Sequence, residues 1–211
     1  MFLNILATSP SAQTSARNLD TNLLICQIAT VACLMSAYRI AGVVKYERND
    51  RLYTLVPPGH PYLRWLRKEA ANLDWLMDYG VMLIVEYGIR TGRKHEGAKY
   101  ILNFVEDFGS PVGLEPQEFY NRAFDNTFDF RYTVDTHLAY RHYVSALWSA
   151  ERKKLSWGDR MPPSWFIEYQ LQRAGKELQS DTTGNGKGGS SLLPRAEGIS
   201  KGSGSNPSRD V

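Results

Sequence analysis

The sequence predicts a mainly α-helical protein: a single-domain helical bundle over residues 1–178 with a short N-terminal strand, then a disordered tail over residues 179–211. Apolar residues recur at steps of three and four, the spacing of one buried helix face. A chain of 211 residues with five Trp and twelve Tyr can bury a sizeable core. The tail is rich in Gly, Ser, Lys and Asp, so it buries too little apolar surface to offset its ordering entropy.

The N-terminal part begins with residues 2–7 (FLNILA), which predict a short strand or an extended segment that enters the core. A short helix is predicted over residues 11–18, because the preceding Ser9-Pro10 pair offers an N-cap and a proline suited to a first turn. Asp20 caps the next helix, which stops at Gly42. This helix is apolar nearly all round, so its few polar residues require partners inside the protein.

The middle of the chain carries the longest helical pattern. Residues 43–59 form a polar connection that is either a hairpin or a mobile loop. His60-Pro61 then opens a helical stretch that Ala70-Ala71 divides and Thr91-Gly92 ends. Residues 112–132 are irregular, and their aromatic cluster either anchors this segment to the core or stacks on bases. Further helices are predicted over residues 96–108, 134–155 and 164–178.

Composition limits the function classes. A formal net charge of only +3 argues against a bulk polycationic nucleic-acid binder, although it leaves room for a local basic patch. Cys26 and Cys33 would lie about 10 Å apart along a helix, too far for a disulfide, which fits a reducing cytoplasm. No zinc site or other cofactor is expected, and we expect no signal peptide. The apolar window at residues 23–38 is short for a membrane span, so a soluble protein is predicted.

The stretch from His60 to His95 is the candidate site, because ionisable residues lie inside its apolar helical pattern. One face is predicted to be core: Leu73, Leu76, Met77, Gly80, Leu83, Ile84 and Tyr87. A second stripe mixes aromatic and charged residues: Trp75, Tyr79, Met82, Glu86 and Arg90. Glu86 and Arg90 are one turn apart, so they form either an ordinary i,i+4 salt bridge or part of a functional site.

Potential cations outnumber acids in and around this stretch, and such a set suits an anion, above all phosphate. The cations are His60, Arg64, Arg67, Arg90, Lys94, His95 and Arg141, and the acids are chiefly Asp20, Glu86 and Asp135. Each also has a structural interpretation, for example a helix cap at His60. The GNGKGG run at 184–189 is interpreted as linker, because no strand precedes it and no helix follows it.

Several segments resemble a family of small tailed-bacteriophage proteins often labelled pyrimidine-dimer DNA glycosylase-like. They are DTNLLICQIATVACLMSAYR at 20–39, HPYLRWLR at 60–67, Asn72 with Trp75-Leu76, EYGIRTGRKH at 86–95, AYRHY at 139–143 and PSW at 163–165. The resemblance covers roughly residues 2–168. In this family the first long helix opens with an Asp-Lys-His-like run and continues with a Lys and a Glu. This chain keeps Asp20 but has Thr21, Asn22, Ile25 and Ala29 there, which predicts a changed substrate.

The resemblance implies chemistry on pyrimidine bases in DNA. A glycosylase/AP lyase would use an amine nucleophile, often the N-terminal amine, but bulky Phe2 disfavours removal of Met1. The same phage setting includes thymidine hypermodification, in which an amino acid replaces the phosphate of 5-phosphomethyl-deoxyuridine in DNA and the host restriction system is evaded. A cation-rich pocket with one acid would serve that transfer, and aromatic walls would hold a flipped base.

The resulting hypothesis is a phage DNA-modifying enzyme in the host cytoplasm that transfers an amino acid to a base in double-stranded DNA, with free amino acid as co-substrate and without metal, cofactor or membrane. Its predicted catalytic residues are Glu86, His95 and Asp20; its phosphate- or carboxylate-binding residues are Arg64, Arg67, Arg90, Lys94, Arg141 and His60; its base-binding residues are Asn22, Trp75, Tyr79, Tyr87 and Tyr143. The alternatives are a glycosylase/AP lyase, a non-catalytic DNA-binding accessory protein, and a structural protein.

Overall fold

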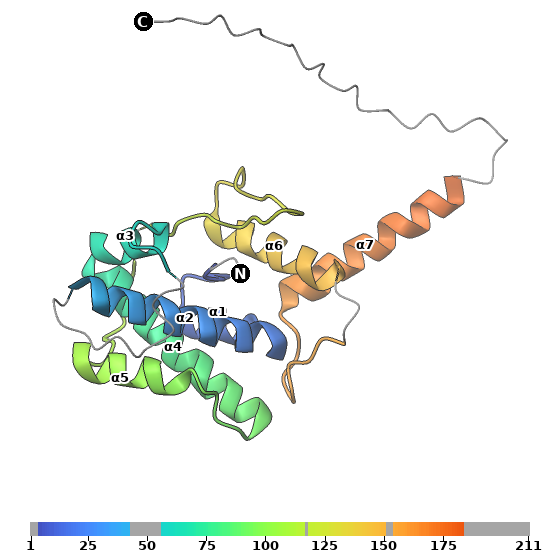
Figure 1. The fold of residues 1–211 in the computed structure, drawn as a ribbon. Helices are drawn as coiled ribbons and strands as arrows, with labels where there is room; N and C mark the ends of the chain where they lie inside the picture. The colour runs from blue at the N-terminus through green and yellow to red at the C-terminus, as the bar shows by residue number, and fades with distance from the viewer. Residues whose placement is uncertain (1–3, 43–55, 117, 151–153, 184–211) are drawn as a thin grey trace, which may run out of the picture. The chain divides into compact units, whose positions relative to one another are not determined.

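The computed structural model describes residues 4–42, 56–116, 118–150 and 154–183. The predicted mainly helical fold is confirmed (Figure 1). Within the described ranges the helices are α1 (Ala12–Asn18), α2 (Thr21–Gly42), α3 (Pro61–Lys68), α4 (Ala70–Thr91), α5 (Ala98–Phe108), α6 (Thr136–Ala150) and α7 (Ser164–Thr183). The chain separates into two units, Met1–Gln172 and Arg173–Val211, and the helices up to α6 belong to the first.

Two predicted boundaries need correction. The last helix was expected to end at residue 178, but α7 continues to Thr183, inside the segment predicted as a disordered tail. The helix predicted over residues 134–155 is shorter, since α6 begins at Thr136. The preceding residue, Asp135, caps this helix, because its side chain accepts the backbone N–H groups of His137 and Leu138. The connection at 43–55 and the tail at 184–211 lie outside the described residues.

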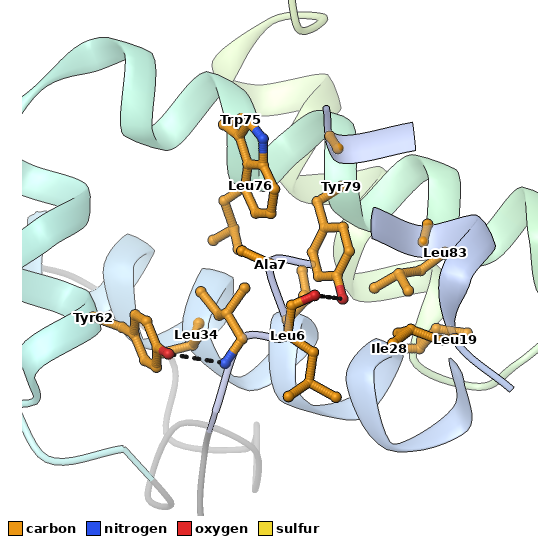
Figure 2. Packing of buried hydrophobic residues seen from close by; sticks show 14 of the residues in the cluster. Leu6, Ala7, Leu19, Ile28, Leu34, Tyr62, Trp75, Leu76, Tyr79 and Leu83 are labelled. Atoms are coloured by element: carbon orange, nitrogen blue, oxygen red, sulfur yellow. Dashed lines mark hydrogen bonds between the residues drawn. The ribbon is translucent and has the colours of Figure 1, made fainter. Parts of the chain in front are cut away.

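The expected N-terminal strand is absent from residues 4–8, which are extended and buried but pair with no other strand. Their backbone groups bond to side chains instead. The N–H of Ile5 donates to the Tyr62 hydroxyl (3.1 Å), and the N–H of Leu6 donates to Oε1 of Gln27 (3.1 Å). Figure 2 shows the first of these bonds among the packed apolar side chains. A segment surrounded by helices has no strand edge to pair with, so polar side chains satisfy its backbone.

Local capping explains where the first helices begin. Ser11, not the predicted Ser9, caps α1, because its side chain accepts the N–H of Thr14 (3.2 Å). Asp20 caps α2 as predicted, since its carboxylate accepts the N–H groups of Asn22 (3.1 Å) and Leu23 (3.2 Å). His60 caps α3 in the same way through Nδ1.

The helix α4 contacts α1, α2, α3 and α5, so more than one of its faces is buried. Leu76 and Leu83 are fully buried, as the predicted core face requires. The second, mixed stripe is largely buried as well: Trp75 is 3% exposed and Tyr79 is 0% exposed, whereas Met82 is partly buried. In contrast, three residues of the predicted core face, Leu73, Ile84 and Tyr87, are only partly buried. The mixed stripe is therefore a packing face as well as the carrier of Glu86.

The close approach of α4 to its neighbours depends on Gly80. A Cβ atom at this position would lie 2.9 Å from Ile101 Cγ2 of α5 and 3.1 Å from Val31 Cγ1 of α2. We expect Gly80→Ala to lower the free energy of unfolding by about 1–2 kcal/mol through overpacking. Urea denaturation of the full chain checks this, with Gly59→Ala as control, because a Cβ at Gly59 meets nothing within 4 Å. Equal midpoints for the two variants would contradict the tight packing.

By length and composition, the stretch Thr21–Ile40 of α2 is apolar enough to cross a membrane, with a mean hydropathy of 1.7. In this fold 56% of that stretch is buried inside the protein. It packs against α4 and α5, and fully buried side chains such as Leu24, Ile28 and Leu34 line its inner faces. The core helix of a soluble protein has the same length and composition, so the soluble state stays a prediction.

Candidate functional site

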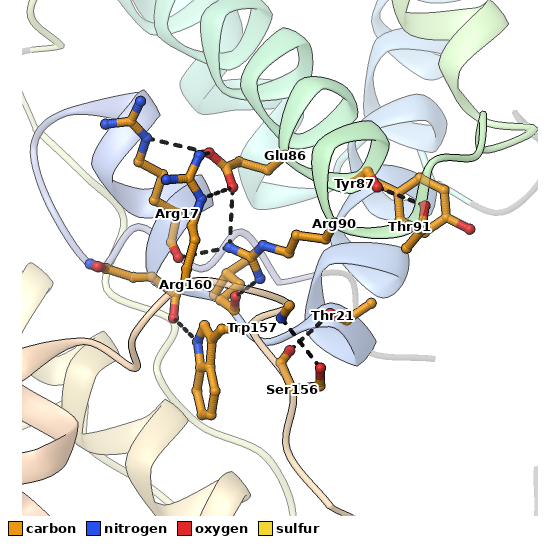
Figure 3. Close-up of polar contacts among 12 residues, drawn as sticks. Arg17, Thr21, Glu86, Tyr87, Arg90, Thr91, Ser156, Trp157 and Arg160 are labelled. Atoms are coloured by element: carbon orange, nitrogen blue, oxygen red, sulfur yellow. Dashed lines mark hydrogen bonds and ion pairs between the residues drawn. The ribbon is translucent and has the colours of Figure 1, made fainter.

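The carboxylate of Glu86 lies at the centre of three arginines, which we call the arginine cluster: Arg17, Arg90 and Arg160. Oε1 accepts from Arg17 Nε (3.3 Å) and Arg160 Nη2 (2.8 Å), and Oε2 accepts from Arg160 Nε (2.9 Å) and Arg90 Nη2 (3.4 Å). Figure 3 shows these contacts. Each carboxylate oxygen therefore accepts two hydrogen bonds, and the predicted i,i+4 ion pair is one part of a larger network.

The segment that delivers Arg160, Ser156–Arg160, is tied to the junction of α1 and α2; we call it the strap. The N–H and the hydroxyl of Thr21 both donate to the Ser156 carbonyl, each at 2.8 Å. The indole of Trp157 donates to the Asn18 carbonyl at 3.1 Å. These bonds fix the backbone of the strap independently of the contact between Arg160 and Glu86. The Arg160 side chain therefore loses less conformational entropy when it forms that contact.

This arrangement bears on the predicted role of Glu86 as a general base. Its side chain is 4% exposed, and both oxygens are already occupied by guanidinium donors. A base must reach the proton that it removes, and each oxygen of this buried carboxylate already accepts two hydrogen bonds from within the protein. The geometry therefore favours the salt-bridge interpretation of Glu86 over the catalytic one.

The predicted cations do not meet in one pocket of the described structure. His60 Nδ1 caps α3, and His95 Nδ1 accepts the Gly97 N–H (3.0 Å) at the start of α5. Arg141 Nε donates to the Thr8 carbonyl (2.8 Å). Burial and the nearby positive charge of Arg122 lower the pKa of His60, which weakens its value as a cation. Arg64, Arg67 and Lys94 are exposed, and of these Arg64 lines a cavity.

The predicted base-binding residues also separate. Tyr79 is fully enclosed in the core, and Tyr143 is buried and donates to Asp125 Oδ2 (3.0 Å). Tyr87 is partly buried and meets the His95 ring edge-on at 5.5 Å. Trp75 stacks on Tyr79 with centroids 4.9 Å apart, and it borders a cavity.

The two remaining predicted residues lie at the start of α2. Asp20 is 1% exposed and accepts the Trp148 indole N–H (3.0 Å) in addition to the backbone N–H groups that it caps. Its carboxylate is therefore occupied by structural donors. Asn22, two residues further on, is exposed to solvent. The side chain of Asn22 is therefore free to contact a ligand. Asp20 could contact one only if it gave up the hydrogen bonds that cap α2.

Two adjoining cavities lie between α3, α4 and the start of α6. The first, which we call the acidic cavity, has a volume of about 860 Å³ and is lined by Trp75, Asp74, Asp78, Glu115, Glu118 and His137, among others. The second, which we call the basic cavity, has a volume of about 620 Å³ and includes Arg64, Trp65, Lys68 and Asn121, with Lys68 Nζ 3.5 Å from Oε2 of Glu118 in an exposed ion pair. Both are bordered by Glu118, Phe119 and Thr136, so they share one wall.

Asp74 builds one side of the acidic cavity. Its carboxylate accepts three consecutive backbone N–H groups, from Val112 (2.8 Å), Gly113 (2.9 Å) and Leu114 (2.8 Å). These bonds fix the irregular segment after α5 against α4. Asp74 was not among the residues predicted for the site, because the predicted set consisted mainly of cations and because the partners of Asp74 lie in a segment without helical periodicity.

The acidic cavity also contains two groups suited to proton transfer. Burial, and then the neighbouring Asp74 charge, raise the pKa of Asp78 above its usual value. His137 Nδ1 lies 2.7 Å from the Ala7 carbonyl, so a neutral ring donates there and keeps Nε2 as a proton acceptor. The spacing of Asp74 and Asp78, two acids at i and i+4 on one helix face, was the available sequence signal for this site.

The raised pKa of Asp78 predicts a pH-dependent effect of Asp78→Asn. A raised pKa in the folded state means that ionised Asp78 weakens the fold, fully above the raised pKa and not at all below the usual value of 3.8. Asp78→Asn should therefore raise the urea midpoint at pH 7, and the gain should shrink as the pH falls towards 4. A gain that stays constant from pH 7 to pH 4 would contradict the shift.

Among the residues that the structure describes, no three His, Cys, Asp or Glu side chains are grouped to hold a metal ion. Comparisons with protein-family models, with curated proteins and with solved structures found no match to this chain.

Proposed function

We propose that this protein modifies pyrimidine bases in DNA, by transferring an amino acid to a phosphorylated base such as 5-phosphomethyl-deoxyuridine. One observation carries the proposal: a basic cavity and an acidic cavity share a wall at Phe119. In a transfer of this kind an amine that arrives as a cation displaces an anionic phosphate from the base, so the reaction needs neighbouring subsites of opposite charge. The resemblance to phage proteins that act on pyrimidines supports the choice of DNA as the substrate.

In the proposed reaction the phosphate occupies the basic cavity, next to Arg64 and Lys68. The amine of the amino acid enters the acidic cavity and loses a proton to Asp78 or to His137 Nε2. Its nitrogen then forms a bond to the base methylene carbon while the carbon–oxygen bond to phosphate breaks, and the phosphate leaves with the electron pair. The guanidinium of Arg64 stabilises the charge that develops on the leaving oxygen.

This assignment transfers the role of general base from Glu86 to the acidic cavity, where a proton acceptor borders open space. It keeps Arg64 as a phosphate ligand and Trp75 as part of the wall that receives the base. The aromatic ring of Phe119 stands between the two subsites and meets Trp75 edge-on at 4.7 Å. Such a pair offers a π-face to a flipped pyrimidine.

The test is nucleoside mass spectrometry of duplex DNA that contains 5-phosphomethyl-deoxyuridine, after incubation with the full chain and mixed amino acids. We expect a nucleoside that has lost phosphate and gained one amino-acid residue, which also identifies the donor. Released base or strand breaks at thymine dimers would instead establish the glycosylase/AP lyase. DNA binding with no product on either substrate would establish the accessory protein and overturn the proposal.

Variants of the basic cavity sharpen this test. Arg64→Ala and Lys68→Ala should each lower the rate of product formation about 10- to 100-fold, the loss expected for one charge-assisted hydrogen bond to phosphate. Arg93→Ala is the matched control, because Arg93 is exposed and lines neither cavity. Equal rates for Arg64→Ala, Lys68→Ala and the control would exclude the basic cavity as the phosphate subsite.

A further inference from the structure

The arginine cluster holds more positive charge and more donors than its carboxylate can satisfy. Three guanidinium groups contact Glu86, and it is the only carboxylate in ion-pair contact with them within the described ranges. Arg90 directs its remaining donors to the carbonyls of Leu19 and Arg17, yet its Nε is buried without a hydrogen-bond partner. Asp20 also acts on Arg90 electrostatically, but its carboxylate is already occupied by the cap of α2 and by the Trp148 indole.

The excess donors face outward on Arg17 and Arg160. The side chain of Arg17 is 48% exposed and that of Arg160 is 35% exposed, whereas that of Arg90 is 1% exposed. Arg17 contacts Glu86 through Nε, and in Figure 3 its two terminal nitrogens point away from the carboxylate. Arg160 contacts Glu86 through Nε and Nη2, which leaves Nη1 for another acceptor.

Both side chains are held before any ligand arrives. Arg17 is anchored at Nε, and Arg160 is anchored by Glu86 and by the strap, whose bonds to Thr21 and Asn18 fix its backbone. An exposed arginine usually loses rotamer freedom when it binds an anion, and this loss weakens binding. In the arginine cluster that loss has already occurred on folding, which favours a planar, multi-donor contact with a phosphate group.

We propose that Arg17 and Arg160 together bind a phosphate oxyanion on the outer side of Glu86. In the DNA complex this oxyanion is a backbone phosphate of the strand that carries the target base. The choice of DNA rests on the proposed function, whereas phosphate binding itself does not.

The position of the arginine cluster fits a neighbouring nucleotide. Ser11 and Ala12, at the start of α1, border the acidic cavity, and so do Asp74 and Asp78 in the first half of α4. The later parts of the same two packed helices carry Arg17 and Glu86. Eight residues of α4 separate Asp78 from Glu86, which is about 12 Å along the helix axis. At about 3.4 Å per nucleotide, the arginine cluster would meet a phosphate about three to four nucleotides from the target base.

The experiment measures binding of the full chain to an ordinary 20-base-pair DNA duplex by fluorescence anisotropy, over a series of salt concentrations. Arg17→Gln and Arg160→Gln should each weaken binding about threefold to tenfold and lower the slope of log affinity against log salt by about one. Arg131→Gln is the control, since Arg131 is exposed and pairs with Asp129. Unchanged affinity and slope in both folded variants would exclude a DNA backbone phosphate as the bound oxyanion and, if inorganic phosphate also leaves the Arg17 Nε–H signal unshifted, would overturn the proposal.

Two further arms separate the possible outcomes. If Arg160→Gln unfolds, Arg17→Gln decides alone, because Arg17 is half exposed and makes a single side-chain contact with Glu86. Titration with inorganic phosphate, followed by NMR of the arginine Nε–H groups, identifies the source. Phosphate shifts that Arg17→Gln abolishes, with unchanged DNA binding, would support the phosphate site and assign it to free phosphate. A nucleoside product, with unchanged DNA binding and no phosphate shifts, would keep the proposed function and reject this inference. A reduced salt slope in the two variants without any nucleoside product would keep this inference and reject the proposed function.

Discussion

Replacing Glu86 by Gln is expected to lower the unfolding temperature by about 6–20 °C. Removal of one partner from a buried ionic network typically costs about 3–5 kcal/mol, because the remaining charge is left without compensation. A domain of about 150–250 residues loses about 2–4 °C for each kcal/mol. Here three guanidinium groups would be left around an amide, and the side chain of Arg90 is 1% exposed and cannot turn to solvent. Calorimetry of the full chain measures the effect.

The matched control is Asp129→Asn, which removes the acid from an exposed pair. Asp129 and Arg131 are 48% and 54% exposed in their side chains, and such pairs contribute less than about 1 kcal/mol. If Glu86→Gln unfolded at the same temperature as this control, the buried network would not support the fold. The same variant also tests catalysis: folded Glu86→Gln protein that makes product at the wild-type rate would exclude Glu86 as the general base.

The helices could be predicted because their signals are local. Asp20 before an apolar run, Pro61 after a capping His60, and Gly92 with its positive φ of 66° each act within one helical turn. Local signals of this kind could not decide whether the N-terminal segment forms a strand. An apolar extended segment looks the same in sequence whether its backbone meets another strand or, as here, the side chains of Tyr62 and Gln27.

The candidate site could be predicted only in part, because most of its contacts join residues that are far apart in the sequence. The Glu86–Arg90 pair follows from helical spacing, but Arg17 and Arg160 lie 69 and 74 residues from Glu86, and no single-sequence pattern connects them. The predicted cation pocket assumed that charges in one stretch converge. In the structure Arg64 of α3 lines the basic cavity, whereas His95 and Arg141 form hydrogen bonds with backbone groups of Gly97 and Thr8. Spacing thus identified charged residues but could not show which ones share a surface.

The largest effect at the proposed reaction site is expected from Asp74→Ala. The substitution removes the acceptor for three consecutive N–H groups, at 2.8 to 2.9 Å from Val112, Gly113 and Leu114. Hydrogen bonds to a charged group contribute about 1.5–3 kcal/mol each, and the exposure of this segment reduces the total to about 3 kcal/mol. Because the segment forms a wall of the acidic cavity, we also expect product formation to fall at least about 100-fold at a temperature where the variant is folded.

Hydrogen exchange separates this positioning role of Asp74 from a direct chemical one. In Asp74→Ala the amides of Val112 to Leu114 should lose their protection, while those of the α4 core should keep it. Asp74→Asn retains one side-chain oxygen and should keep part of both the protection and the activity. If protection remained at the wild-type level while product formation was lost, Asp74 would act on the substrate itself. If both remained, the wall that it holds would not be part of the site, and the acidic cavity would lose its place in the proposed reaction.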